Sequence, residues 1–298
     1  MRALDQLQEL RRKARVTRKN LRQRGELLYA MVNPFIRECY PEFLCIGAPR
    51  TGTTWLYSTL KKHPDVFLPW KKELHFFDEP IIREWHGKRQ NINICPYGRY
   101  FNLENPSDWR WYSLQFRAAG KRITGDITPG YSRLSDERVK LVSEKLPHVR
   151  IIFIMREPVQ RAWSGVRNFA LRRMRKRLDQ VLVKEIMDFT MHPRRLMGGD
   201  YSEIIPRWEH YFKQERILYL FYDDLVSDPL SLANKVCEFL SLDPDRLRDR
   251  EAIKARVNAA DQEHDMPDVI RDALSKRYRG QIEFLEARFG RDLSAWKG

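Results

Sequence analysis

Cysteine is scarce in this 298-residue chain, and long apolar runs are missing altogether. The four cysteines, at positions 39, 45, 95 and 237, form no CxxC pair and have no histidine nearby at metal-ligand spacing, so the sequence indicates no metal site. No stretch of 18 apolar residues occurs, and the N-terminus lacks the apolar block of a secretory signal. We therefore expect a soluble, cytoplasmic protein, with Cys45 and Cys237 as buried free thiols.

Acidic residues are outnumbered, because 40 Asp and Glu stand against 55 Lys and Arg and leave a net charge of +15. This excess favours anionic partners such as nucleic acid, acidic lipid surfaces, polyanionic sugars or nucleotides. One basic concentration, RRKARVTRKNLRQR (11–24), follows leucines three residues apart and predicts a partly amphipathic helix in an N-terminal extension, residues 1–40. Such a helix is either a solvated element or a contact to an acidic membrane surface or polyanion.

Short apolar runs alternate along the chain with longer stretches of helical periodicity. The candidate strands are FLCIGA (43–48), RITG (122–125), RIIFIM (150–155) and ILYLF (217–221). Strands that are apolar throughout predict a sheet covered on both faces, and strand–helix alternation predicts parallel connections. The fold class is therefore α/β, with three α/β/α layers around a mainly parallel sheet, in a domain spanning 41–298. Within it, residues 79–115 form a long insertion or lid.

The segment GAPRTGTT (47–54) has the spacing of a phosphate-binding loop, with two glycines five residues apart between a strand and a helix. Such loops usually carry a lysine where this chain has Thr53, and here the cation is Arg50 instead. That lysine reaches the terminal phosphates of ATP, and the hydroxyl after it holds magnesium. The departure favours a smaller anion that needs no divalent ion.

A second candidate half-site lies in RIIFIMREPVQRAWS (150–164), where Arg156 follows an apolar strand and Pro158 suits the first position of a helix. Ligands of open α/β sheets bind at the carboxyl ends of strands, so Arg156 is expected to face a crevice, with Ser164 in the helix behind it. A guanidinium and a hydroxyl together suit a phosphate monoester.

These two segments resemble the sulfotransferase family that uses 3′-phosphoadenosine 5′-phosphosulfate (PAPS). The run of a basic residue, x and Gly-Thr-Thr is similar to the family's 5′-phosphosulfate loop, although lysine is the commoner basic residue there, and Arg-x-Pro-x-x-Arg-Ala-x-Ser is similar to its 3′-phosphate motif. Further similar segments, such as KKELHFFD (71–78) and GDITPGYS (125–132), extend the resemblance over residues 42–296. It implies that the 5′-phosphosulfate is bound by Arg50, Thr51, Gly52, Thr53 and Thr54, and the 3′-phosphate by Arg156 and Ser164.

The resemblance also implies catalytic roles for three residues. Asp126 stands where many relatives carry glutamate and would be the general base, with a strand-ending turn residue as the structural alternative. Lys72 would hold the bridging oxygen of the leaving nucleotide, unless it is a solvated lysine. His75 is a rival base or an assisting acid, or else a packed histidine. Tyr201 resembles an aromatic residue near the nucleotide, and core packing is the alternative.

The predicted function is transfer of the sulfuryl group from PAPS, without a metal, to a hydroxyl or amine of a carbohydrate, glycolipid or small alcohol, leaving adenosine 3′,5′-bisphosphate (PAP). A magnesium–ATP kinase is the rival enzyme, and it predicts a lysine at position 53. A nucleic-acid-binding module is disfavoured, since the sequence carries no helix–turn–helix, zinc or RNA-binding signature. A second basic cluster, LRRMRKR (171–177), suits an anionic sugar or lipid headgroup as acceptor or simply ends a helix in solvent. Aromatic residues between 85 and 112 form either an acceptor wall or a core.

Overall fold

The computed structural model describes residues 21–22, 24–79, 81–85, 88–92, 100–170, 181–255 and 265–297. The chain divides into two compact units, of which unit 1 comprises Met1–Tyr40 with His75–Gly120 and unit 2 comprises Pro41–Leu74 with Lys121–Gly298. The division after Tyr40 falls where the N-terminal extension was expected to end, and the expected insertion corresponds to the second part of unit 1. The assignment of 41–298 as one domain stays a prediction.

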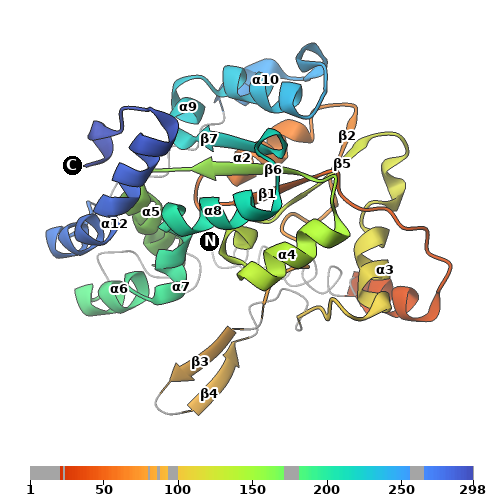
Figure 1. Ribbon diagram of the computed structural model, residues 1–298, viewed down its shortest axis with the longest axis horizontal. Helices are drawn as coiled ribbons and strands as arrows, with labels where there is room; N and C mark the ends of the chain where they lie inside the picture. Colours follow the sequence, from red (N-terminus) through yellow and green to blue (C-terminus); the bar gives the residue numbers. More distant parts are fainter. Residues whose placement is uncertain are drawn as a thin grey trace, which may run out of the picture. The chain divides into compact units, whose positions relative to one another are not determined.

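Unit 2 contains a five-stranded parallel sheet in the order β2-β5-β1-β6-β7 (Figure 1). Its strands are β1 (Phe43–Gly47), β2 (Val66–Phe67), β5 (Ile123–Ile127), β6 (Arg150–Met155) and β7 (Ile217–Phe221). The sheet confirms the predicted α/β class and four of its strands. The two-residue strand β2 carries too little pattern to be predicted from sequence.

Helices cover both faces of this sheet. The α-helices of unit 2 are α2 (Thr53–Leu60), α4 (Asp136–Lys145), α5 (Pro158–Phe169), α6 (Val183–Thr190), α7 (Pro193–Leu196), α8 (Tyr201–Tyr211), α9 (Tyr222–Ser227), α10 (Pro229–Phe239), α11 (Arg250–Ala255) and α12 (Asp268–Phe289). Short 3₁₀ turns include η2 (Pro129–Arg133) and η5 (Met197–Gly199). Figure 1 shows α10 along one side of the sheet and α4 and α8 along the other.

The apolar strands are explained by these two coverings. Successive side chains of a strand point to opposite faces. Ile152 and Ile154 of β6 therefore pack into a buried cluster with α2 and α10, while Phe153 between them contacts Tyr201 of α8. Cys45 and Cys237 lie in the first cluster, which confirms them as buried free thiols.

The order of the strands reverses the direction of the connections beside β1, where open α/β folds usually bind ligands. This central strand has β5 on one side and β6 on the other, so the connections run in opposite directions from it. Loops that leave the carboxyl ends of β1, β5 and β6 therefore meet at one edge of the sheet, the usual ligand site of an open α/β fold.

Unit 1 is held by aromatic residues. It contains α3 (Pro106–Leu114), the short η1 (Arg117–Ala119) and an antiparallel pair, β3 (Ile81–Trp85) with β4 (Lys88–Ile92). Phe76 stacks on Tyr112 at 4.1 Å between ring centroids, and Phe101 stacks on Trp111 at 4.4 Å. The rings of Trp111 and Tyr112 in α3 are fully buried. The sequence left open whether the aromatic residues of this region form an acceptor wall or a core, and these two belong to a core.

A helical stretch covering residues 24–32 also belongs to unit 1. The Ala30 carbonyl accepts a hydrogen bond from Nε of Arg110 at 2.8 Å, and Ala30 is fully buried. Across the part of the chain that the structure describes, none of the helices combines the length and the apolar character needed to cross a bilayer.

Candidate active site

The candidate phosphate-binding loop, residues 47–54, connects β1 to α2. Gly52 is the N-cap residue of α2 with φ of 88°, and among the described residues no side chain caps this end. The first N–H groups of a helix have no partner inside it, and the helix dipole adds positive potential there. An uncapped start whose first turn, Thr53–Trp55, carries no acidic residue is suited to an anion.

Only glycine fits at position 52. A β-carbon there would lie 2.4 Å from Cδ2 of Leu225 in α9, and the positive φ is unfavourable for other residues. Gly47 is similarly constrained, since its β-carbon would lie 2.6 Å from the Pro129 carbonyl oxygen. The two glycines of the motif thus allow α9 and η2 to approach the loop closely.

The three threonines of the loop have different surroundings. Thr51 is fully buried, and its hydroxyl donates to the Ala48 carbonyl at 2.7 Å, so it braces the loop from inside. Thr53 is buried at the start of α2, whereas the side chain of Thr54 is exposed. The anion contacts expected of these residues stay predictions, and the backbone N–H groups at the helix start are the donors that the geometry offers most directly.

The two predicted half-sites meet at the guanidinium of Arg50. Its Nε donates to the hydroxyl of Ser164 on α5 at 3.1 Å, 114 residues away in sequence. From the end of β6, Nη1 of Arg156 donates to the Arg50 carbonyl at 3.2 Å. The fold therefore gathers Arg50, Arg156 and Ser164 into one cationic cluster.

Burial affects the Arg156 guanidinium of this cluster. Loss of water on burial lowers the pKa of Arg156, and the nearby positive charge of Arg167 acts in the same direction, while Tyr222 opposes this shift. A guanidinium that has lost part of its water beside another cation gains from binding an anion, because the anion restores the lost solvation and offsets the repulsion.

Tyr201 holds the backbone at Arg156. The ring is fully buried, and its hydroxyl accepts from the Arg156 N–H at 3.1 Å and donates to the Arg156 carbonyl at 2.6 Å. Burial raises the pKa of this hydroxyl to about 12, so it keeps its proton. The structure gives Tyr201 a role in fixing Arg156, while a direct contact with the nucleotide stays a prediction.

Asp126 lies on β5 opposite Leu44 of β1 and is 1% exposed. Its two carboxylate oxygens accept from the hydroxyls of Thr128 at 2.7 Å and Tyr131 at 2.8 Å. The Thr128 contact is the local one that the turn interpretation expected, whereas Tyr131 comes from η2. Since η2 also packs against Gly47, the carboxylate lies beside the start of the phosphate-binding loop.

Lys72 is linked to the same region through its charge. Its ammonium is paired with the carboxylate of Glu73, and the Lys72 side chain is 17% exposed, so it is not the fully solvated lysine of the structural alternative. Burial raises the pKa of the Cys45 thiol to about 12, while Lys72 lowers it and Asp126 raises it. Both candidate catalytic charges therefore act on one buried atom of β1.

His75 belongs to unit 1, where its Nδ1 lies 2.8 Å from a carboxylate oxygen of Asp78. This contact fits the interpretation of a packed, hydrogen-bonded histidine. Its role as a base or assisting acid stays a prediction.

Two residues near this cationic cluster were not predicted from the sequence. The ring of Tyr222 lies under the Arg156 guanidinium, 4.3 Å from its centroid, in a cation–π contact. Met155 pairs with Phe221 in the sheet, so Arg156 and Tyr222 follow neighbouring strand ends, and only this register brings the two residues together. Arg167, which is three residues after Ser164, lies on the same face of α5.

Some predicted features lie outside the described residues, namely the basic cluster 172–177 and most of the basic segment 11–24. Within the described ranges, no group of three or more His, Cys, Asp or Glu side chains is placed to hold a metal ion.

An uncapped helix start, a glycine loop after a central parallel strand and a cluster of arginines define a phosphate-binding α/β protein. A family model described as "Sulfotransferase family" matches residues 41–246, more than half of the chain. The chain belongs to the sulfotransferase family. This confirms the resemblance carried by its two motifs.

Curated relatives and solved structures agree with this assignment. The chain is 25% identical to human carbohydrate sulfotransferase 15, over 74% of this chain and 47% of that protein. It is 28% identical to human heparan sulfate glucosamine 3-O-sulfotransferase 6, over 69% of this chain and 54% of that protein. The chain thus spans about half the length of these relatives. A sulfotransferase from Alicyclobacillus acidocaldarius has the same fold, with a TM-score of 0.64, 22% identity, and coverage of 87% of this chain and 100% of that one.

Proposed function

We propose that the protein transfers a sulfuryl group from PAPS to a hydroxyl or amine of an acceptor. The observation that carries the proposal is the hydrogen bond from Arg50 to Ser164, which joins the loop expected to hold the 5′-phosphosulfate to the helix expected to hold the 3′-phosphate. A nucleotide with anions at both ends of one ribose fits a pocket built from two half-sites. The absence of a lysine at position 53 argues against the rival magnesium–ATP kinase.

In the proposed reaction the acceptor oxygen or nitrogen attacks sulfur in line with the bond to the 5′-phosphate. A new bond to sulfur forms, the old S–O bond breaks, and the leaving oxygen remains on PAP. Asp126 takes the acceptor proton on one of its carboxylate oxygens, which accept hydrogen bonds from Thr128 and Tyr131 in the structure. Lys72 offsets the negative charge that builds on the leaving oxygen. His75 is the alternative base.

We propose that the acceptor group is a carbohydrate hydroxyl. A glycolipid and a small alcohol are the alternative acceptors. The printed names of the relatives refer to carbohydrate and to heparan sulfate glucosamine. The net charge of +15 supports an anionic sugar or lipid headgroup over a neutral one.

The nucleotide part of the proposal is tested by calorimetric titration with PAP, beside ATP with magnesium. We expect PAP to bind and ATP with magnesium not to bind. Because hydrogen bonds from a charged donor are lost, Arg156→Ala and Arg50→Ala should each weaken PAP binding by about 10- to 100-fold.

Arg216→Ala is the matched control. Arg216 lies just before the amino end of β7, whereas the candidate site lies at the carboxyl ends of the strands. Its Nη1 donates to the His148 carbonyl at 2.7 Å. It should leave PAP affinity unchanged. Binding of ATP with magnesium alone, or equal losses in all three variants, would reject the proposed site.

We also propose that the N-terminal arm contacts an acidic membrane surface on the cytoplasmic side. Between residues 21 and 35 several apolar side chains are strongly exposed, including Leu28 at 62%, Val32 at 76% and Phe35 at 92%. Leu28 and Val32 lie opposite the buried Ala30, because two helical positions apart is about half a turn. The basic sequence that precedes them supplies charge complementary to anionic lipid.

A further inference from the structure

The chain beyond the family match is connected to the candidate nucleotide site. The match ends at residue 246, whereas α12 and the residues after it, Asp268–Lys297, lie against elements that carry pocket residues. This segment is called the C-terminal brace below. Its polar contacts fall into two groups, one behind Arg156 and one behind Gly52.

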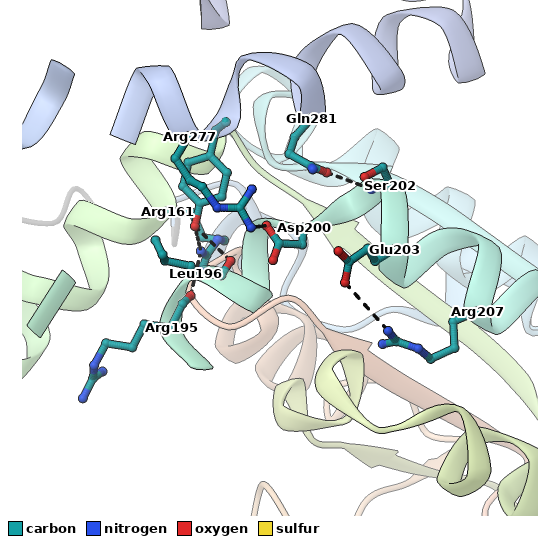
Figure 2. A network of polar contacts seen from close by, with 10 residues as sticks. Arg161, Arg195, Leu196, Asp200, Ser202, Glu203, Arg207, Arg277 and Gln281 are labelled. Atoms are coloured by element: carbon teal, nitrogen blue, oxygen red, sulfur yellow. Dashed lines mark hydrogen bonds and ion pairs between the residues drawn. The ribbon is translucent and has the colours of Figure 1, made fainter. Parts of the chain in front are cut away.

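The first group centres on the Tyr278 hydroxyl, whose partners Arg161 and Leu196 are labelled in Figure 2. It accepts from Nη2 of the buried Arg161 at 3.1 Å and donates to the Leu196 carbonyl at 2.9 Å. Arg161 lies on α5, between Arg156 and Ser164. The Tyr278 ring lies too close to Gly199 for a side chain at that position, because a β-carbon there would lie 2.8 Å from Cε1 of Tyr278. Helix α12 is thus in direct polar contact with the helix of the 3′-phosphate motif.

The same helix holds the start of α8. Arg277 forms an ion pair with Asp200 at 2.7 Å, and the side-chain oxygen of Gln281, one turn later, accepts from the Ser202 N–H at 2.8 Å (Figure 2). The residue between them is Tyr201, whose hydroxyl makes both hydrogen bonds to the Arg156 backbone. The start of α8, which α12 holds, therefore carries the side chain that is hydrogen-bonded to the Arg156 backbone.

The second group holds α9. Arg291 makes two hydrogen bonds to the Asp224 carboxylate, at 2.8 and 2.6 Å, and Nε1 of Trp296 donates to Asp223 at 3.3 Å. On either side of this acidic pair, Tyr222 supports the Arg156 guanidinium and Leu225 packs where a β-carbon of Gly52 would be. The brace thus reaches the phosphate-binding loop as well.

We propose that the C-terminal brace is a positioning element for the PAPS pocket, setting Arg156 through Tyr201 and the phosphate-binding loop through α9. The proposal rests on the proposed function, because it assigns the pocket to a bisphosphate nucleotide. Tyr278, Arg277 and Arg291 touch no reacting group; they act through the residues that they hold. A site for two anions on one ribose needs both half-sites at a fixed separation, and the brace contacts Arg161 of one half-site and α9 beside the other.

The test compares two arginines of the brace that have the same kind of partner. Arg291 and Arg288 are 33% and 32% exposed and pair with Asp224 and Glu209 at 2.6 and 2.7 Å. The Glu209 carboxylate also accepts a hydrogen bond from the Tyr219 hydroxyl, and neither Glu209 nor Tyr219 belongs to the candidate nucleotide site. Arg291→Gln should weaken PAP binding by about five- to tenfold, the effect of misaligning charge-assisted hydrogen bonds. Arg288→Gln should lower the melting temperature comparably and leave PAP affinity unchanged.

Tyr278→Phe is a second variant, since it removes one hydroxyl and keeps the packed ring. It should also weaken PAP binding severalfold, with a far-ultraviolet circular dichroism spectrum like that of the wild type. If Arg291→Gln and Tyr278→Phe lower the melting temperature but bind PAP like the wild type, the brace is merely structural and the inference is overturned, while the proposed function stands. If the wild type itself does not bind PAP, the proposed function fails first.

Discussion

At the level of single residues, the candidate site contains buried charged side chains with identified hydrogen-bond partners. Asp126 is nearly inaccessible, yet both of its oxygens accept hydrogen bonds from hydroxyls that rotate easily. Rotatable hydroxyls allow the hydrogen bonds around this carboxylate to rearrange when an acceptor group approaches, as a general base requires.

Substitution of this carboxylate tests its role. Asp126→Asn should lower kcat by about 10²- to 10⁴-fold, the usual contribution of a general base, and leave PAP affinity unchanged. The control is Asp108→Asn, since Asp108 is also 1% exposed and accepts from the Asn102 N–H at 2.7 Å, in unit 1. It should cost stability without changing kcat specifically. A kcat for Asp126→Asn within a few-fold of the wild type would favour His75 as the base.

At the level of elements, the short turn between β1 and α2 is tightly constrained. It has a left-handed glycine against α9 and a buried threonine that braces its own backbone. We expect Gly52→Ala to lower the free energy of unfolding by roughly 1–3 kcal/mol, because φ of 88° and the 2.4 Å approach of Leu225 both oppose a β-carbon. It should weaken PAP binding as well, since the helix start must shift.

Gly280→Ala in α12 is the contrasting substitution. Nothing lies within 4 Å of a β-carbon there, and the residue is inside a helix, so alanine should raise the free energy of unfolding by about 0.5–1 kcal/mol. Chemical denaturation of both variants measures the difference. Equal stability of the two variants would contradict the packing argument at Gly52.

At the scale of the whole molecule, the excess of 15 positive charges gives a field that attracts anionic surfaces. We expect the full chain to sediment with phosphatidylcholine vesicles that contain phosphatidylserine, and to be released at about 0.5 M salt as charges are screened. Val32→Ser should reduce binding by removing apolar area from the exposed helix. Val269→Ser, which changes a valine 54% exposed on α12, should not. Equal binding to neutral vesicles, or equal loss in both variants, would exclude the N-terminal arm as the contact.

The sequence by itself determined the class of fold and the chemistry of the two phosphate half-sites. The apolar strands of five or six residues before the glycine turn and before Arg156 are local patterns. Burial on both faces selects apolar residues along each strand, and a left-handed turn selects glycine. The strand bounds of β6 and β7 agree with the prediction for that reason. The family resemblance then supplied the roles that local patterns leave open.

Only the tertiary structure decided which residues meet. The contact of Arg50 with Ser164 spans 114 residues, and Tyr201 proved to hold a backbone through its hydroxyl rather than simply to fill a core. Arg167 and Tyr222 approach Arg156 because neighbouring strands end together and a helix turns every 3.6 residues. Long-range contacts of this kind depend on how whole elements pack, and a single sequence carries no periodicity that encodes them.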